Sequence, residues 1–329
     1  MMFEVREEAS RERFAASWEE CMKGAPWFDS DVMFWIKPEE ELERLRCIHR
    51  DNSFFLVSGH GSDPEPLGVL SVQVQGGVGK IGPWEPGVTL AGRRMGVGEA
   101  LLRGAREKLG DRGADKMEFT LRYPCYAPAQ AAWLDGLYRG CGFSQRGPTG
   151  LQMLADLSQA ESLGVDDIRG LRITGRENLS IDDIVGYTLR AFTSDPRDKT
   201  YFSWDPLTST KDGAQRFFKG IFSQERERSP PEFFRVAWID GEPAGFAGSF
   251  AGKSEEMRGI VGPVGVFPEY RRRGIATALV LSACDALRSE GYRYAYLSTH
   301  VDNLPARSMY EGIGFKPVFN TVEFERSIG

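Results

Sequence analysis

The strongest constraint on the fold is a short pattern that occurs twice in the 329 residues. It consists of an arginine, two variable residues, a glycine, one more variable residue and a glycine or alanine. The pattern spans Arg93 to Gly98 in the first half and Arg271 to Ala276 in the second, 178 positions apart. A helix-forming run follows each copy, Glu99 to Leu109 and Ala278 to Leu287. The length is comfortable for two domains, so the repeat predicts two related units in tandem.

The second copy has the sequence of a strand that leads through a turn into a helix. The apolar strand Val264 to Val266 stops before Pro268, and three arginines and Gly274 precede the helix. The first amides of a helix have no intrahelical partner, and the helix dipole adds partial positive charge there. Such a turn is therefore an anion cradle. Three guanidinium groups beside it suit a pyrophosphate better than a carboxylate.

A second motif follows downstream, Asn303-x-x-Ala306-x-x-x-Tyr310-x-x-x-Gly314-Phe315. With this spacing, the loop and the downstream motif together resemble the two signatures of the GCN5-related N-acetyltransferases (GNAT). The resemblance covers nearly the whole chain and implies a tandem member, similar in layout to the mycothiol synthase type. It assigns an acyl-CoA site to Val264, Val266, Arg271, Arg272, Arg273, Gly274, Ile275, Ala276, Thr277 and Asn303.

The order of strands and helices in each half predicts an α/β fold. A hairpin is expected where Phe233 to Ile239 and Ala244 to Ala251 flank Asp240-Gly241. The resemblance implies two GNAT-type domains, each a mixed, mostly antiparallel sheet flanked by helices, with splayed parallel central strands. We expect an N-terminal domain at 1–157, a linker at 158–170 and a C-terminal domain at 171–329.

The two copies differ in ways that favour the second as the catalytic one. At the offsets of Asn303 and Ala306, the first half has Ala131 and Leu134. The strand expected before the first loop, Trp84 to Leu90, contains an interior proline, which is unfavourable within a sheet. The first half either binds acyl-CoA without turnover or only retains the fold. If it binds, the site consists of Arg93, Arg94, Gly96 and Gly98.

The resemblance assigns the catalytic acid to Tyr310, which would protonate the departing thiolate. An unperturbed phenol has a pKa near 10, so it carries its proton at neutral pH. Tyr138 has the same place in the first half, where we expect it only to pack. Asn303 either binds the pantetheine amides or caps a helix before Pro305. Gly265 suits a strand bulge or a close backbone approach. An amide freed near Val266 would then polarise the thioester carbonyl.

The sequence does not identify a general base. The strand Gly259 to Val266 has no carboxylate, although many relatives keep one there. His300 has a suitable pKa range, but a lone histidine is more often structural. Otherwise water relays the proton, or the acceptor-side segment Phe192 to Asp205 supplies the base. Glu255 and Glu256 lie earlier than the relevant strand, and Glu85 has a comparable place in the first half but stands beside a proline. The aromatic and charged residues of the acceptor-side segment suit a small polar acceptor and equally describe an ordinary surface loop; they include Asp195, Arg197, Tyr201, Trp204 and Asp205.

The composition argues against several classes of binding partner. The net charge of −6 and the pI near 5.4 argue against nucleic acid and anionic membranes. The first residues lack the order of a signal peptide, and no apolar run approaches a membrane span, so we expect a cytoplasmic protein. Five scattered cysteines are expected to be buried reduced thiols rather than disulfides or ligands. Three dispersed histidines predict no metal site.

Together these features predict an acetyl-CoA-dependent N-acetyltransferase. It would move an acetyl group to the amine of a small molecule by direct transfer in a ternary complex. Cys284 lies inside the helix after the loop and has no evident histidine partner, which disfavours an acyl-enzyme. The alternatives are a non-catalytic acyl-CoA-binding or sensor protein, a protein N-acetyltransferase and an aminoacyl-tRNA-dependent transferase.

Overall fold

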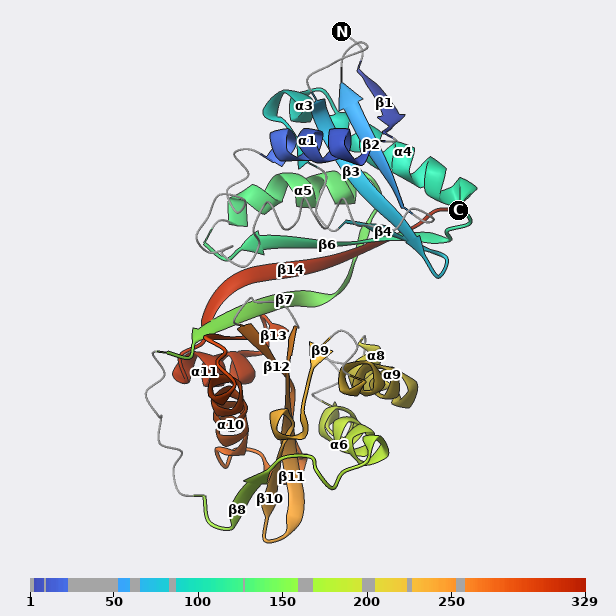
Figure 1. Cartoon of the computed structure of the whole chain (residues 1–329). Coiled ribbons are helices and arrows are strands. Elements are labelled where there is room, and N and C mark those ends of the chain that lie inside the picture. The colour runs from blue at the N-terminus through green and yellow to red at the C-terminus, as the bar shows by residue number, and fades with distance from the viewer. Residues whose placement is uncertain are drawn as a thin grey trace. The chain divides into compact units, whose positions relative to one another are not determined.

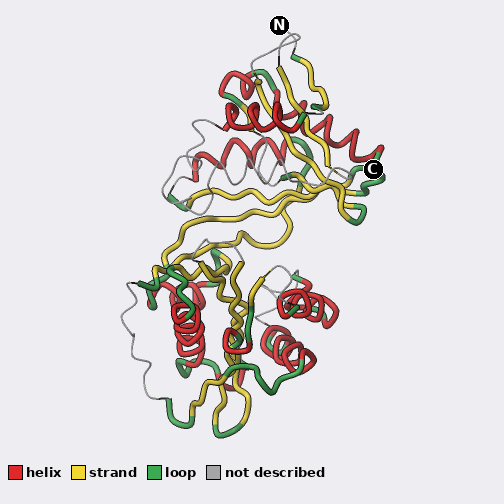
Figure 2. The backbone as a smooth tube through the Cα atoms, viewed as in Figure 1, coloured by secondary structure: helices red, strands yellow, loops and turns green. Residues whose placement is uncertain are grey.

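The computed structural model describes residues 3–8, 10–22, 53–59, 66–82, 87–126, 128–158, 168–196, 205–223, 227–252 and 258–329. They form two compact units, Met1–Arg146 with Phe319–Gly329, and Gly147–Val318. Each unit has one mixed, mostly antiparallel sheet with helices packed on it, as Figure 2 shows by the alternation of yellow strands and red helices. The expected α/β class is confirmed. Among the described residues, every helix is too short or too polar to cross a bilayer.

The first unit has the sheet order β1-β2-β3-β4-β6-β14, in which only β4 and β6 run parallel. The small strand β5 pairs with β3. In Figure 1 the last strand of the chain, β14, follows β6 along its length. The elements are β1 Glu4–Glu7, α1 Arg11–Met22, β2 Ser53–Gly59, β3 Pro66–Gln75, β4 Val78–Ile81, β5 Gly87–Val88, α3 Leu90–Arg94, α4 Val97–Asp111, β6 Lys116–Pro124, α5 Pro128–Gly140 and β14 Lys316–Ser327.

The second unit has the order β7-β13-β12-β11-β10-β8, and only β12 and β13 run parallel. Figure 1 shows α10 and α11 on one side of this sheet and α6, α8 and α9 on the other. The elements are β7 Ser144–Asp156, β8 Leu171–Thr174, α6 Ile181–Thr193, α8 Pro206–Ser209, α9 Lys211–Phe222, β9 Glu227–Arg228, η3 Pro231–Phe233, β10 Arg235–Ile239, β11 Glu242–Gly252, β12 Arg258–Val266, η4 Pro268–Tyr270, α10 Ile275–Ser289, β13 Tyr294–His300 and α11 Leu304–Gly312.

The two units differ from the sequence-based division at 1–157, 158–170 and 171–329. The strand that closes the first half, β7, pairs with β13 of the second unit. The strand that closes the second half, β14, pairs with β6 of the first unit from Phe319 to Ser327. Each half therefore contributes its last strand to the sheet of the other unit. A repeat in the sequence locates the strands along the chain but does not say which sheet they join.

Local sequence explains how the second unit is held together. Asp240 and Gly241 both have positive φ, 51° and 90°, which makes the tight turn expected between β10 and β11. Ser180 and Asp183 form a reciprocal capping box that starts α6. A Cβ on Gly265 would lie 2.7 Å from the Cβ of Ala191, so only glycine lets α6 pack this closely on β12. The prediction of a close backbone approach at Gly265 is confirmed.

The prediction of a strand over Trp84 to Leu90 is wrong at its C-terminal end. Residues 83–86 lie outside the described part of the chain, and only Gly87–Val88 form a strand. Thr89 instead starts helix α3, because its side chain accepts a hydrogen bond from the Gly92 N–H at 3.1 Å. Thr89 therefore caps a helix and is not a strand residue.

The four described cysteines are free thiols, whereas Cys47 lies outside the described residues. Burial raises the pKa of Cys21 and of Cys284 to about 12. Cys125 and Cys141 are only half-buried. A thiol with so high a pKa is a poor nucleophile, which argues against an acyl group passing through Cys284.

Candidate functional site

The parallel strands β12 and β13 pair over only three residues, Arg258–Ile260 with Tyr294–Tyr296, and then separate. The cause lies in β12, where the register with β11 changes from Val261 opposite Ser249 to Val264 opposite Ala247. One extra residue is therefore inserted at Gly262–Pro263. Proline has no N–H to donate to a ladder. The bulge predicted at Gly265 thus lies at Gly262–Pro263 instead.

The separation leaves backbone groups of β12 facing an open gap. The Phe267 N–H donates to the Ala244 carbonyl at 2.9 Å, and Gly265 is opposite Phe246. Antiparallel pairs alternate between bonded and non-bonded, so Val264 and Val266 direct their N–H and C=O groups away from β11. They lie on the side of β12 that faces β13, where the Val266 carbonyl accepts from the Arg271 Nε at 3.0 Å. The predicted free amide at Val266 is supported by this register.

The loop after β12 has the backbone of an anion cradle. Arg272 has φ 63° and Gly274 has φ 79°, both left-handed, and Gly274 is the N-cap of α10. No described side chain caps this helix, and its first turn has no acidic residue. The first intrahelical bond runs from the Ala278 N–H to the Gly274 carbonyl. The amides of residues 275–277 therefore have no partner within the helix.

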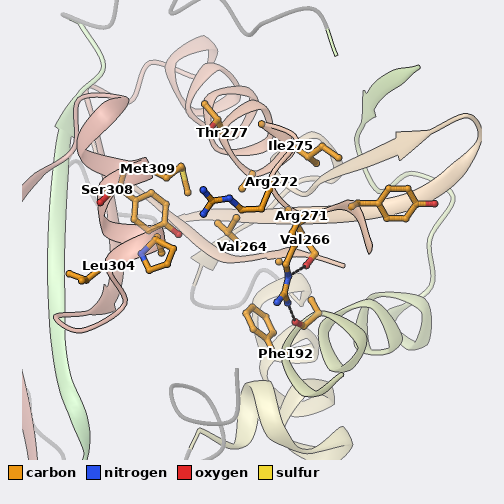
Figure 3. Close-up of a pocket in the computed structure, with 18 residues that line it drawn as sticks. Phe192, Val264, Val266, Arg271, Arg272, Ile275, Thr277, Leu304, Ser308 and Met309 are labelled. Carbon is orange, nitrogen blue, oxygen red and sulfur yellow. Dashed lines mark hydrogen bonds between the residues drawn. The ribbon is translucent and has the colours of Figure 1, made fainter. Parts of the chain in front are cut away.

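The three arginines of the loop have different roles. Arg271 donates from Nε to the Val266 carbonyl at 3.0 Å and from a terminal nitrogen to the Ala191 carbonyl at 2.8 Å. Arg273 donates to the Glu269 carbonyl at 3.3 Å and lies 5.6 Å from the ring centre of Tyr270. Arg272 lines a cavity, and Figure 3 shows its guanidinium extending toward the α11 side. Arg271 and Arg272 thus line the cavity, with the guanidinium of Arg271 bonded to the protein itself, whereas Arg273 is not part of the lining.

The cavity has a volume of about 690 Å³ and lies between the end of β12, the start of α10 and the helix α11. Figure 3 shows Val264 and Val266 on β12, Ile275 and Thr277 on α10, and Ser308 and Met309 on α11. Its lining consists of Ala191, Phe192, Val264, Gly265, Val266, Tyr270, Arg271, Arg272, Gly274, Ile275, Ala276, Thr277, Leu304, Pro305, Ala306, Ser308, Met309 and Tyr310. Nearly all the predicted acyl-CoA residues are therefore brought to one cavity.

Tyr310 is 7% exposed, and burial raises the pKa of its hydroxyl to about 12. Its ring is tilted against Phe315 at 6.0 Å, and the residue lines the cavity. Asn303 is the N-cap of α11, in agreement with the prediction that it precedes a helix, although its side chain makes no capping hydrogen bond. Asn303 and His300 are not part of the cavity lining. His300 is 8% exposed, and its backbone is paired with Gly150.

Among the described residues, the cavity lining contains no carboxylate and no histidine. Asp195 lies 3.4 Å from Arg271 and is an ion-pair partner. Asp205 is the N-cap of α8, where it accepts from the Leu207 N–H at 2.9 Å. Both of these candidate bases therefore have a structural partner. The carboxylates of Glu85, Glu255 and Glu256 lie outside the described residues, as do Arg197, Tyr201 and Trp204 of the expected acceptor-side segment.

The first unit has a similar loop but a different environment. Gly96 has φ 75° and is the N-cap of α4, and Arg93 donates from Nε to the Val88 carbonyl at 3.2 Å. The first turn of α4, however, contains Glu99. A Cβ on Gly98 would lie 2.8 Å from Leu137 of α5, so that helix packs directly on the loop. Arg94 is exposed beside it.

Two aromatic residues of α5 pack closely against their neighbours in the first unit. The guanidinium of Arg93 lies 4.4 Å from the ring centre of Trp133. Tyr138 is fully buried, stacked on Phe119 at 4.4 Å and on Phe324 at 5.5 Å. The prediction that Tyr138 serves packing is supported by this environment.

Sequence reasoning missed several residues that line the cavity. Ala191 lies at the end of α6, next to Phe192, the first residue of the expected acceptor-side segment, while Leu304, Ser308 and Met309 lie on α11. Helical spacing offered a signal for α11, because Met309 lies four residues after Pro305 and next to Tyr310. No comparable signal marks the end of α6, since its approach to β12 depends on tertiary packing.

The described residues include no group of three or more His, Cys, Asp and Glu side chains that could hold a metal ion. Within the described residues, the cradle and the cavity offer a ligand backbone amides, the side chains of Arg271 and Arg272, and apolar walls.

Three comparisons bear on this site. The profile of the Acetyltransferase (GNAT) family matches residues 191–315, which include the cradle, the cavity and Tyr310. A mycothiol acetyltransferase of Clavibacter sepedonicus is 26% identical over 294 residues, covering 89% of this chain and 87% of the relative. The same two-unit architecture occurs in solved structures.

One such structure is a tandem GNAT protein from the clavulanic acid biosynthesis pathway. It is 18% identical, with a TM-score of 0.59, and the match covers 100% of this chain and 99% of that chain. A GCN5-related N-acetyltransferase from Sphaerobacter thermophilus is also 18% identical, with a TM-score of 0.67, and the match covers 99% and 96%. These two likenesses establish the tandem GNAT fold.

Proposed function

We propose that this chain transfers an acetyl group from acetyl-CoA to the amine of a small molecule, because it has the tandem GNAT fold and its residues 191–315 match the profile of the acetyltransferase (GNAT) family. The second unit is the catalytic one in this proposal. The observation that supports it most is the cavity of about 690 Å³, which joins an uncapped helix N-terminus to the end of β12, beyond the residues that pair with β13.

The residues of the cavity fit the parts of acetyl-CoA. The amides of residues 275–277 and the guanidinium of Arg272 suit the pyrophosphate, because both favour negative charge. The apolar walls formed by Val264 and Met309 suit the pantetheine arm. When bound, acetyl-CoA supplies an activated acetyl thioester. The Val266 N–H faces the gap and is the donor that we assign to its carbonyl oxygen.

We assign to Tyr310 a hydrogen bond to the thioester sulfur. An alkyl thiol has a pKa of about 8.5, whereas burial raises the pKa of Tyr310 to about 12. Burial favours the neutral phenol, so Tyr310 carries its proton at neutral pH and donates a hydrogen bond to the sulfur as the carbon–sulfur bond breaks. The ammonium form of the acceptor loses one proton before attack, and the second proton that its nitrogen loses after attack balances the departing thiolate.

The acceptor amine must lose its proton before it can attack. Since no described residue of the lining is a carboxylate or a histidine, we propose that water carries this proton from the cavity. The acceptor is an amine on a small molecule, and the mycothiol acetyltransferase relative places mycothiol-type amines among the first acceptors to test.

Release of the CoA thiol from acetyl-CoA in the presence of a panel of small amines tests this function. We expect one class of amine to raise thiol release at least a hundredfold over buffer in the wild type. Gly274→Glu should abolish that release, because it puts a carboxylate in the cradle. Gly274→Ala is the matched control for the strain of a side chain at φ 79° and should retain more activity. Binding of acetyl-CoA without release by any amine would favour the sensor alternative.

A further inference from the structure

Arg271, the first residue of the repeated pattern, has its guanidinium surrounded by acceptors of the protein itself. It donates to the carbonyls of Val266 and Ala191 and to the carboxylate of Asp195 at 3.0, 2.8 and 3.4 Å. The Arg271 side chain is 27% exposed and that of Asp195 is 10% exposed. Figure 3 shows the Arg271 side chain directed away from Arg272, on the Phe192 side. Arg271 thus lines the cavity, but its guanidinium bonds to the protein itself.

These three acceptors lie on two elements that meet at the cavity. Val266 ends β12, while Ala191 is in the last turn of α6 and Asp195 follows that helix. The carbonyls of a last helical turn lack intrahelical partners and lie at the negative end of the helix dipole. A guanidinium is therefore well placed there, and Arg271 joins the end of α6 to the end of β12.

The residue next to Arg271 has a backbone conformation that needs support. Arg272 has φ 63°, which is unfavourable for a residue with a Cβ. Such a conformation persists where the surrounding structure fixes it. Arg271 is fixed on one side of Arg272, and Gly274 begins α10 on the other. If the bonds of Arg271 are lost, Arg272 is free to leave this conformation and the cradle changes shape.

We propose that Arg271 and Asp195 are positioning residues that clamp the phosphate loop to the end of α6. The loop has the shape that binds acyl-CoA only while this clamp is closed. Coupling of this kind is reciprocal: if opening the clamp weakens acyl-CoA binding by some factor, acyl-CoA disfavours opening by the same factor. The inference rests on the proposed function, because its ligand is acetyl-CoA. It links cofactor binding to α6, the helix that precedes the acceptor-side segment.

The chain offers a matched control between the same elements. Arg190 of α6 and Glu269 of η4 also form an ion pair, but their side chains are 46% and 49% exposed. Exposed pairs contribute little, because water and salt screen them. Glu269→Gln therefore removes a charge at the same junction without opening the clamp.

The first measurement is the dissociation constant of acetyl-CoA for wild type, Asp195→Asn, Arg271→Lys and Glu269→Gln. We expect Asp195→Asn and Arg271→Lys to weaken binding about tenfold or more, since a charge-assisted hydrogen bond is lost. Glu269→Gln should change it less than threefold. Circular dichroism checks that each variant is folded. Equal affinity of wild type and both clamp variants would overturn the clamp.

The second measurement is hydrogen exchange of residues 188–196 with and without saturating acetyl-CoA. In the wild type and in Glu269→Gln, acetyl-CoA should slow exchange at the end of α6. In Asp195→Asn the slowing should disappear although the ligand is bound, which a merely structural loss does not explain. Equal protection in Asp195→Asn would overturn the coupling. Failure of the wild type to bind acetyl-CoA would overturn the proposed function and, with it, the clamp.

Discussion

The loops after β5 and after β12 share a left-handed glycine before their helices and have opposite surroundings. Each has a left-handed glycine as helix N-cap, with φ 75° at Gly96 and 79° at Gly274. In each, the leading arginine donates from Nε to the strand carbonyl five residues earlier, at 3.2 and 3.0 Å. Three residues after the glycine, the first loop has Glu99 and the second has Thr277. A carboxylate in the first helical turn competes with a bound anion, whereas a hydroxyl does not.

The helices that face the two loops differ as well. In the first unit, α5 brings Leu137 to 2.8 Å from a Cβ placed on Gly98 and stacks Trp133 on Arg93. In the second unit, Ala276 lines an open cavity opposite α11. The repeated pattern thus specifies a turn, while the third helical residue and the facing helix decide whether a ligand has room. We assign acyl-CoA binding to the second loop alone.

The largest expected effect separates the two equivalent tyrosines. Tyr310→Phe should lower kcat about 10²- to 10³-fold, because the hydrogen bond to the sulfur is lost. Tyr138→Phe should leave kcat within about twofold, since Tyr138 is stacked between Phe119 and Phe324. Steady-state thiol release with the acceptor found in the amine panel measures both. A large loss of kcat in Tyr138→Phe would contradict the division between the units.

The next effect comes from moving the carboxylate of the first loop into the second. Thr277→Glu should weaken acetyl-CoA binding about 10²- to 10³-fold, because two like charges about 5 Å apart at an effective dielectric of 20 repel by roughly 3 kcal/mol. Thr277→Gln has a similar size without the charge and should weaken binding far less. Fluorescence or calorimetric titration gives both constants. Unchanged affinity in Thr277→Glu would place the pyrophosphate elsewhere.

Burial of Tyr310 also predicts an alkaline limit for the second unit. The folded pKa is about 12 and the ordinary value is 10, so the folded state keeps the proton that the unfolded chain loses first. This contribution is fully present below pH 10 and disappears as pH rises from 10 to 12, about 3 kcal/mol in total. Urea midpoints measured at pH 9 and pH 11 should fall less in Tyr310→Phe than in the wild type. Identical declines would show that Tyr310 is accessible to water.

A smaller effect tests the closed packing of the first loop. Gly98→Ala should destabilise the protein by about 1–3 kcal/mol, since its Cβ would lie 2.8 Å from Leu137. The reverse exchange at the equivalent position, Ala276→Gly, adds no atom to a cavity wall and should cost about 1 kcal/mol or less through backbone entropy. Thermal unfolding followed by circular dichroism compares the two. A neutral Gly98→Ala would indicate that α5 stands farther from the loop.

Sequence patterns predicted what depends on local chemistry. The hairpin at Asp240-Gly241 and the helix after Gly274 follow from conformations that only certain residues adopt easily. The exchange of β7 and β14 between units was not predictable, because strands of similar composition pair equally well in either sheet. The internal role of Arg271 was also missed. It depends on Ala191 and Asp195, about 80 residues earlier, which meet the loop only in the folded chain.

Calorimetric titration of acetyl-CoA into wild type, Gly274→Glu and Gly96→Glu tests most directly which loop binds acyl-CoA. Both glycines have nearly the same φ, so the two substitutions impose the same backbone strain and the same new charge. We predict one equivalent bound by the wild type and by Gly96→Glu, and none by Gly274→Glu. Two equivalents in the wild type, or loss of binding in Gly96→Glu alone, would contradict the assignment of acyl-CoA to the second loop.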